Sequence, residues 1–218
     1  APHTLTVKVD GRGATARREA ATVATVRETG VVDGGHQRRE VREVGGEVGD
    51  RGLSATSYKT FEMGWRLATF GLFRLASALS PLMVGRGHGT LLVTSATAAV
   101  RGNRGQHSHA ASMGGRRMLC QTLNAELGPQ GIHIAHILID GAVDAPDTLG
   151  KMLGPERYQE LRETRGMEHD GLMLPEKIAD TYFHLAQQHR STWTHEIDLR
   201  SFGDLPWWNT RGGISGEV

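Results

Sequence analysis

Histidine side chains are the best suited to acid–base chemistry near neutral pH, and two pairs of them stand close together in the sequence. His107 and His109 are two residues apart, and His133 and His136 are three apart. A metal site needs three or four converging ligands, and residues three apart on a strand point to opposite faces. We therefore expect no metal site, and His109 is the candidate proton donor or acceptor.

The single cysteine is a poor candidate for a nucleophile. Cys120 falls in the middle of a helical pattern, with no adjacent residue that could act as a base. A reactive thiol needs a neighbour that lowers its pKa. We expect Cys120 to be structural.

A glycine-rich turn near the start of the chain is the candidate phosphate-binding element. Gly11 and Gly13 stand between a strand-like run, residues 5–9, and a helix-like run, residues 14–29. Backbone N–H groups at such a turn can cradle the pyrophosphate of a dinucleotide. An ordinary strand-to-helix turn is the alternative.

These residues are positioned by an alternation of strands and helices. Residues 89–94 and 132–139 are apolar runs that predict buried strands. Residues 109–127 between them have helical spacing, which Gly128 and Pro129 end. A strand, a long helix and a strand in this order predict a right-handed crossover in a parallel sheet.

The remaining patterns extend the same architecture. An apolar stripe predicts the longest helix over residues 58–84, ended by Pro81 and the glycines from Gly85. Two short helices, 154–165 and 175–188, and a last strand, 194–199, follow. The fold class we predict is α/β, a doubly wound, Rossmann-like parallel sheet.

Length and composition limit the classes of partner. The chain of 218 residues suits one domain, and its 25 basic and 24 acidic residues give no general attraction to nucleic acid. We expect no apolar run that approaches the roughly 20 residues of a membrane span, and no secretory leader is evident. With one cysteine, a reducing, cytoplasmic setting is expected.

Several motifs in their order and spacing resemble the short-chain dehydrogenase/reductase family. They are Gly-Thr-Leu-Leu-Val-Thr-Ser at 89–95, Ala-Glu-Leu-Gly-Pro-Gln-Gly-Ile-His-Ile at 125–134, and Asp140-Gly141 after the second strand. The aromatic helix at 61–73 and the strand at 193–200 agree with it. The resemblance covers residues 58–205, and it implies a carbonyl or alcohol oxidoreductase that uses NAD(P).

The same resemblance assigns positions to the family's catalytic tetrad, and all four hold other residues here. The position of the catalytic Tyr falls on His109, that of the Lys on Met113, that of the Ser on Ala96 and that of the Asn on Ala68. The two alanines and the methionine cannot titrate near neutral pH. Residues 90–130 contain neither Tyr nor Lys, so a shift of the alignment would not restore the pair. Ser95 could partly replace the missing hydroxyl.

The cofactor-binding half also departs from the family pattern. Residues 1–57 are too few for all the strand–helix units expected there, each of about 30 residues, so this half is predicted to be shortened. Asp140 stands where the family has Pro, and Ala145 stands near the family's Thr. The candidate cofactor-binding residues are Gly11, Gly13, Asp140, Gly141 and, as a substitute, Thr148.

The resemblance further implies an oligomer. In this family the helix predicted at 58–84 pairs with the helix at 109–127 across a subunit interface, so a homo- or hetero-oligomer through these helices is expected. A small-molecule ligand is compatible with the scaffold. Residues 206–218 would form a tail, with Trp207 and Trp208 as its anchor.

Three functions stay open from the sequence. One is a non-catalytic relative that serves as a partner subunit or small-molecule binder. The second is an active, divergent NAD(P)-dependent oxidoreductase with His109 as the acid. The third is a cofactor-independent lyase or cyclase that uses His109 as an acid or base.

Overall fold

The computed structural model describes residues 23–25 and 52–208. The predicted turn with Gly11 and Gly13, and the tail beyond Trp208, lie outside the described residues. Within the described part, four strands form one parallel sheet in the order β1-β2-β3-β4. The strands are β1 (Val23–Thr25), β2 (Gly89–Ala96), β3 (Ile132–Asp140) and β4 (Glu196–Arg200).

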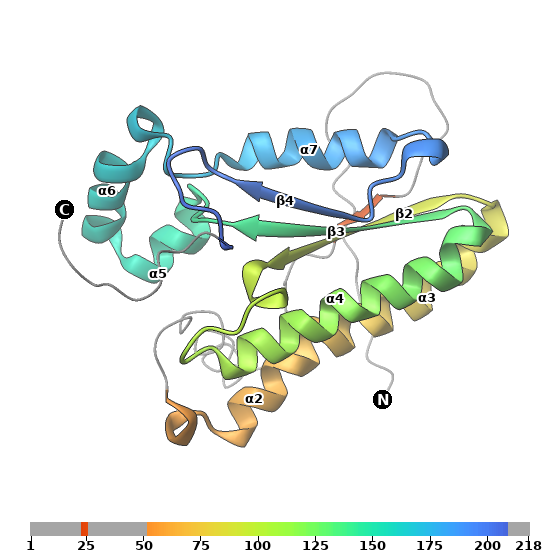
Figure 1. Cartoon of the computed structure of the whole chain (residues 1–218), viewed down its shortest axis with the longest axis horizontal. Helices are drawn as coiled ribbons and strands as arrows, with labels where there is room; N and C mark the ends of the chain where they lie inside the picture. Colours follow the sequence, from red (N-terminus) through yellow and green to blue (C-terminus); the bar gives the residue numbers. More distant parts are fainter. Residues whose placement is uncertain (1–22, 26–51, 209–218) are drawn as a thin grey trace.

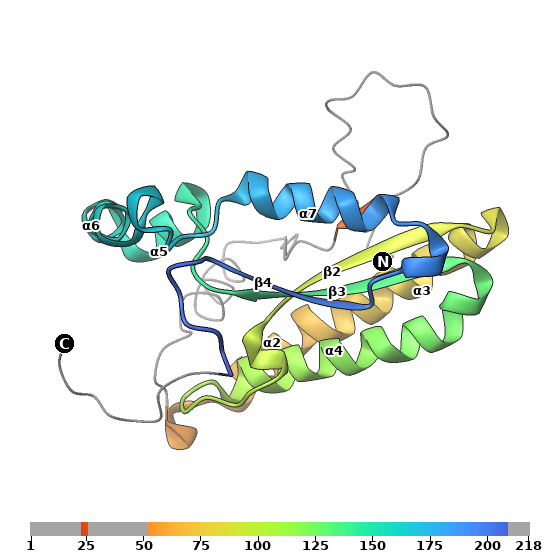
Figure 2. The same ribbon diagram turned by 45° about the horizontal axis from the view of Figure 1, so that its top comes forward.

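Helices cover both faces of the sheet (Figure 1). On one face lie α2 (Tyr58–Trp65), η2 (Arg66–Phe70), α3 (Gly71–Arg86) and α4 (His107–Leu127). On the other face lies α7 (Pro175–Gln187). Figure 2 shows α3 and α4 side by side beneath the strands. The predicted doubly wound α/β fold is therefore confirmed.

Short elements complete the chain around the carboxyl ends of the strands. Beyond β3 and β4 lie η5 (Pro146–Gly150), α5 (Lys151–Leu153), α6 (Pro155–Arg165) and η6 (Met167–His169). The other short turns are η1 (Leu53–Ala55), η3 (Thr97–Ala99), η4 (Gly128–Gln130) and η7 (Arg190–Thr192).

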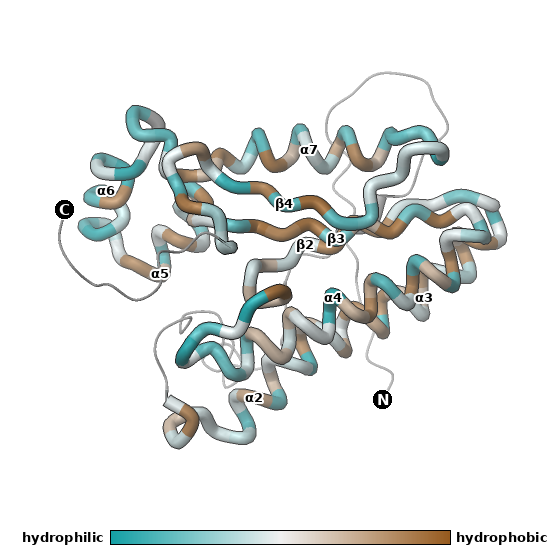
Figure 3. The backbone as a smooth tube through the Cα atoms, in the orientation of Figure 1, coloured by the Kyte–Doolittle hydropathy of each residue, from teal (hydrophilic) through white to brown (hydrophobic). Residues whose placement is uncertain are grey.

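The buried faces follow from the sequence of the central strands. β2 and β3 are buried along nearly their whole length, which explains their continuous apolar runs (Figure 3). One apolar cluster joins Leu72, Met83, Leu91 and Ile134 between the sheet and α3–α4. A second cluster joins Leu92, Ile137 and Leu185 under α7. The sheet thus has a core on each side.

One predicted element was wrong at the start of the described part. Residues 14–29 were expected to be helical, but Val23–Thr25 is a strand that pairs with Thr90, Leu91 and Leu92 of β2. Two of its three residues are β-branched, which favours an extended backbone. Pairing with an open strand edge outweighs a weak helical pattern.

The long helix starts after Ser57, whose side chain accepts a hydrogen bond from the Thr60 N–H at 3.1 Å, and Gly87, with φ 74°, caps its end. It differs from its prediction in two ways. It continues past Pro81, which was expected to help end it. In its middle, η2 has π-helical geometry, an insertion that is frequent at functional sites.

By length and composition, the continuous helix Tyr58–Arg86 could cross a membrane. The prediction that no segment approaches this length was wrong as stated, because single polar residues interrupt the apolar run without making the helix polar. Core helices that pass the same test are mostly buried, whereas only 28 % of the apolar window of this helix is buried. Leu72, Ala76 and Met83 are among its buried residues.

Candidate functional site

Three of the four positions assigned to the tetrad meet in one apolar cluster. Ala68 comes from η2 and Met113 from α4, and both are buried together with Ala98. Ala96, at the end of β2, packs against this cluster from a half-buried position. The helical insertion, the strand end and α4 therefore converge at the predicted place, but on side chains that carry no titratable group.

Ser95 does not offer a free hydroxyl to a ligand. Its side chain is buried, and its Oγ lies 3.7 Å from the Met113 Sδ, to which it donates. A thioether is a weak acceptor. The hydroxyl that could replace the missing Ser is thus turned into the apolar cluster.

His109 lies in the first turn of α4, one helical turn before Met113. Residues four apart share a helix face, so the imidazole is on the same side of α4 as the cluster, in a half-buried position. Its neighbour Ser108 donates to the Thr60 carbonyl oxygen at 3.1 Å and packs against Gly64. Of the four positions that the resemblance assigns to the tetrad, only this one holds a side chain that can exchange a proton.

Arg116 is a buried cation behind the cluster that sequence reasoning missed. It is 3 % exposed, and its guanidinium donates to the Thr94 carbonyl oxygen at 2.6 Å and the Ala68 carbonyl oxygen at 3.3 Å. It ties α4 to β2 and to the π-helical segment. Thr69 strengthens the same junction by donating to the Ser112 carbonyl oxygen at 2.7 Å. The spacing of Arg116, three residues after Met113 on the same helix, was the signal in the sequence that could have placed it beside the cluster.

The predicted cofactor residues beyond β3 are only partly brought together. Asp140 ends β3, and its Oδ2 accepts a hydrogen bond from the Trp207 backbone N–H at 2.9 Å. Burial raises the pKa of this carboxyl above its ordinary value. Gly141 follows with φ 152°. Thr148 lies apart from them in η5, exposed.

A second polar cluster, also missed from the sequence, joins α4 to the edge strand. Glu196 accepts two hydrogen bonds from the Arg117 guanidinium, at 2.7 and 2.8 Å, and one from the His136 Nδ1 at 2.9 Å. The hydrogen bonds from Arg117 hold the pKa of Glu196 below its usual range. Burial lowers the pKa of His136. These shifts favour a carboxylate beside a neutral imidazole.

His133 and His136 separate as the strand geometry requires. His133 stacks on Trp193 with ring centroids 5.0 Å apart and bonds to the Thr194 carbonyl oxygen, whereas His136 bonds to Glu196. Within the described part of the chain, no group of three or more His, Cys, Asp or Glu side chains is arranged to hold a metal ion.

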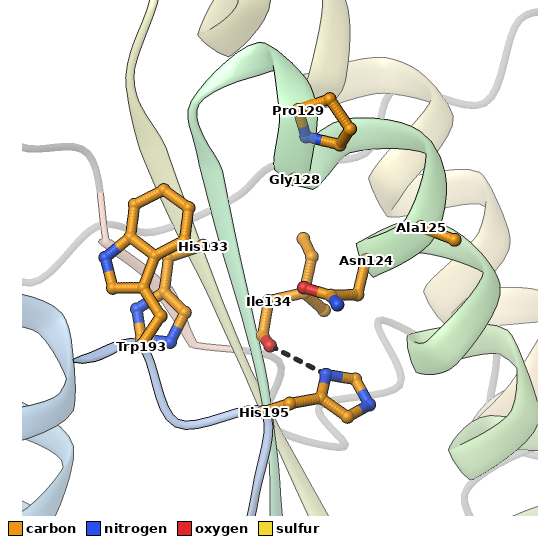
Figure 4. Close-up of a pocket in the computed structure, with 8 residues that line it drawn as sticks. All are labelled: Asn124, Ala125, Gly128, Pro129, His133, Ile134, Trp193 and His195. Atoms are coloured by element: carbon orange, nitrogen blue, oxygen red, sulfur yellow. Dashed lines mark hydrogen bonds between the residues drawn. The ribbon is translucent and has the colours of Figure 1, made fainter. Parts of the chain in front are cut away.

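Two hollows lie on the α4 side of the sheet. One, of about 340 Å³, is at the amino end of β3 (Figure 4). There the His195 Nδ1 donates to the Ile134 carbonyl oxygen at 3.1 Å. The other, of about 430 Å³, lies beside Trp207 and Trp208. Neither includes His109 or Met113 in its lining.

Comparison with known proteins gives consistent matches. A family profile described as enoyl-(acyl carrier protein) reductase matches residues 19–197. The short-chain reductase protein NovJ of Streptomyces niveus is 34 % identical over 120 residues, 54 % of this chain and 45 % of that protein. This chain thus spans about half the length of that relative.

Solved structures agree on the fold. A short-chain dehydrogenase from Rhodopseudomonas palustris is 27 % identical with a TM-score of 0.53, over 70 % of this chain and 57 % of that one. An NADPH-bound short-chain oxidoreductase from Pseudomonas aeruginosa, described as having an atypical catalytic center, is 18 % identical with a TM-score of 0.59, over 72 % and 62 %.

Proposed function

Because the chain belongs to the short-chain dehydrogenase/reductase family, we propose that it uses this oxidoreductase scaffold without performing the family's proton relay, as a partner subunit or small-molecule binder. One observation carries the proposal. Ala68, Ala98 and Met113 form a buried apolar cluster, with Ala96 beside it, at the positions assigned to the tetrad. Apart from His109, the side chains at these positions cannot donate or accept a proton, so they cannot supply the family's proton relay.

The described residues are a poor fit to the reactive end of a nicotinamide cofactor. Met113 has no donor for a ribose hydroxyl, and the Ser95 hydroxyl is directed at the Met113 sulfur. Asp140 brings a carboxylate that is already bonded to Trp207. A bound nicotinamide cofactor would supply hydride transfer, and these residues offer no group to orient it for that step.

Titration with NADH and NADPH tests the cofactor part of the proposal. Quenching of tryptophan fluorescence and calorimetry should show binding no tighter than millimolar, since the ribose contacts are missing. Saturable micromolar binding, followed by NADPH-dependent reduction of a carbonyl panel, would contradict it.

Replacement of His109 separates the remaining mechanisms. We expect His109→Ala to leave any activity of the preparation unchanged, with His107→Ala as the matched control in the same helical turn. A loss of activity in His109→Ala but not in His107→Ala would favour the alternative function, an acid–base enzyme that uses the His109 imidazole. The observation behind that alternative is the half-buried position of His109 on the cluster side of α4.

The partner surface we propose is the outer face of the long helix and α4. Large apolar side chains are exposed there, and two aromatic pairs stack at 5.6 and 6.4 Å between centroids. These side chains are Phe61, Trp65, Phe70, Phe73 and Met118. An exposed apolar patch of this kind marks an interface. The partner is a second copy or a related subunit that retains Tyr and Lys.

Sedimentation measures this association. Phe73→Glu should dissociate an oligomer that the wild-type chain forms, alone or with a co-expressed relative. Phe183→Glu, on the opposite side of the sheet and also exposed, should not. An unchanged oligomer in Phe73→Glu would exclude this face.

The cellular compartment we propose is the reducing cytoplasm, which is consistent with a free, buried Cys120.

A further inference from the structure

The chain after β4 crosses the carboxyl ends of the neighbouring strands. Residues 201–208, which we call the strap, leave β4 near α5 and α6 and end beside the tip of β3 (Figure 1). Ligands of open α/β sheets bind outside these strand ends. The strap therefore lies at the edge of the fold where access matters.

One residue of the strap joins three parts of the sheet edge. The Trp207 backbone N–H donates to Asp140 Oδ2 at 2.9 Å, at the end of β3. Its indole N–H donates to Asp198 Oδ2 of β4, also at 2.9 Å. Its carbonyl oxygen accepts from Arg101, after β2, at 3.0 Å. Asp140 is 7 % exposed, so its bond to the strap is shielded from water.

Other residues of the strap bind residues 155–170, which include α6 and η6 and which we call the α6 segment. The Gly203 N–H donates to the Asp170 carbonyl oxygen at 2.8 Å, and Arg165, the last residue of α6, pairs with Asp204 at 2.8 Å. A Cβ at Gly203 would lie 2.5 Å from the His169 carbonyl oxygen, so glycine permits this close approach. The strap is thus bonded to the α6 segment at one end and to the sheet at the other.

The α6 helix has little core of its own. Of its eleven residues only Tyr158 is buried, and its hydroxyl donates to Asp144. Arg162 pairs with the same carboxylate at 3.3 Å. Asp144 itself belongs to the connection that leads from β3 into this segment. After α6, the chain is fixed beside the end of β3, where the Met173 N–H donates to the Ala142 carbonyl oxygen at 2.9 Å. These contacts join the segment to the β3 side of the sheet, whereas the strap joins it to β4.

We propose that the strap is a latch that holds the α6 segment beside the carboxyl ends of β3 and β4. It has two catches: the hydrogen bond from the Trp207 N–H to Asp140 joins it to the sheet, and the ion pair between Asp204 and Arg165 joins it to α6. Release of either catch lets α6 move away from β4, while the bridge between Val143 and Met173 still holds the chain just after the segment beside β3. The latch goes beyond the proposed function and does not depend on it.

Hydrogen–deuterium exchange of the full chain tests the latch. Asp140→Asn keeps the side chain's shape but exchanges a charged acceptor for a neutral one, which is about half as strong. We expect amides of α6 to exchange about fivefold faster, although the hydrogen bond and ion pair of Asp140 in the described part of the chain go to Trp207 and Arg200 and not to α6. Asp204→Asn should give a similar acceleration in α6 and in the strap. Asp180→Asn, which loses an exposed ion pair on α7, is the matched control and should change neither.

The double variant decides between one latch and two separate contacts. Once either catch is released, the strap no longer ties α6 to the sheet, so Asp140→Asn/Asp204→Asn should accelerate α6 little more than the stronger single variant. Amides of β3 serve as the reference for an intact fold. Unchanged α6 exchange in Asp140→Asn, or accelerations that multiply in the double variant, would overturn the proposal. If Asp140→Asn does not fold, Asp204→Asn must accelerate exchange up to Trp207, and failure to do so overturns it equally.

Discussion

Introducing a lysine at Met113 tests how well the apolar cluster excludes water and polar partners. Met113 is 4 % exposed and packs with Ala68 and Ala98, and the cluster contains no carboxylate. Arg116 lies three residues further along the same helix and is also buried. Burial and the nearby Arg116 guanidinium both disfavour the charged ammonium form of a lysine here. We expect Met113→Lys to be neutral at pH 7 in the folded protein.

The cost follows from the pKa of an unfolded lysine. Deprotonating a side chain of pKa about 10.4 at pH 7 costs about 3.4 × 1.36, or about 4.6 kcal/mol. A folded-state pKa below the unfolded one means that the unfolded state binds more protons, so the stability of the variant rises with pH. The cost should fall by about 1.4 kcal/mol per pH unit, to about 1.9 kcal/mol at pH 9.

Urea denaturation between pH 7 and 9 measures this slope. Met113→Leu is the control, expected to cost less than about 1.5 kcal/mol at every pH, because it keeps volume and apolarity. A cost of Met113→Lys below about 1 kcal/mol that does not vary with pH would refute the reasoning. The ammonium would then have found water or acceptors, and the site could house the family's lysine.

Three further results are expected. Glu196→Gln should lower the free energy of unfolding at pH 7 by about 1–2 kcal/mol. Because the pKa of Glu196 is lowered by Arg117, its contribution is present above the ordinary carboxyl pKa and is lost as pH falls through the folded value. Urea midpoints of wild type and variant should therefore converge in acid. Cys120, fully buried with its pKa raised to about 12, should resist thiol reagents in buffer and react only as urea unfolds the chain. Leu72→Ala should cost about 2–5 kcal/mol in thermal or urea unfolding, whereas Leu82→Ala, on the exposed side of the same helix, should stay within about 0.5 kcal/mol.

The strands and helices from residue 58 onward were predictable because their periodicity is strong. The buried strands 89–94 and 132–139 correspond to Gly89–Ala96 and Ile132–Asp140, and the helix 109–127 to His107–Leu127. Val23–Thr25 was mistaken for helix, because the strand residues that pair with it and make it extended come 67 residues later, Thr90 opposite Val23. Local propensity cannot register such a distant partner.

The site was predictable in part. Spacing and resemblance pointed to Ala68, Ala96 and Met113, and the structure packs them around one cluster. The direction of the Ser95 hydroxyl and the hydrogen bonds of Arg116 were not accessible, because they depend on how α4 and the π-helical segment are rotated against each other. A charged residue on a helix reads as solvent-exposed until its partners are known.

By itself, the sequence determined the parallel α/β fold and the absence of Tyr and Lys from residues 90–130. Both are properties of residue type and of order along the chain. Only the tertiary structure decided that Ala68 and Met113 lie in a buried apolar cluster backed by Arg116, and that Asp140 is bonded to Trp207. The physical reason is that burial and hydrogen-bond partners are set by segments far apart in sequence. Trp207 reaches Asp140 across 67 residues, a distance over which no local pattern carries information.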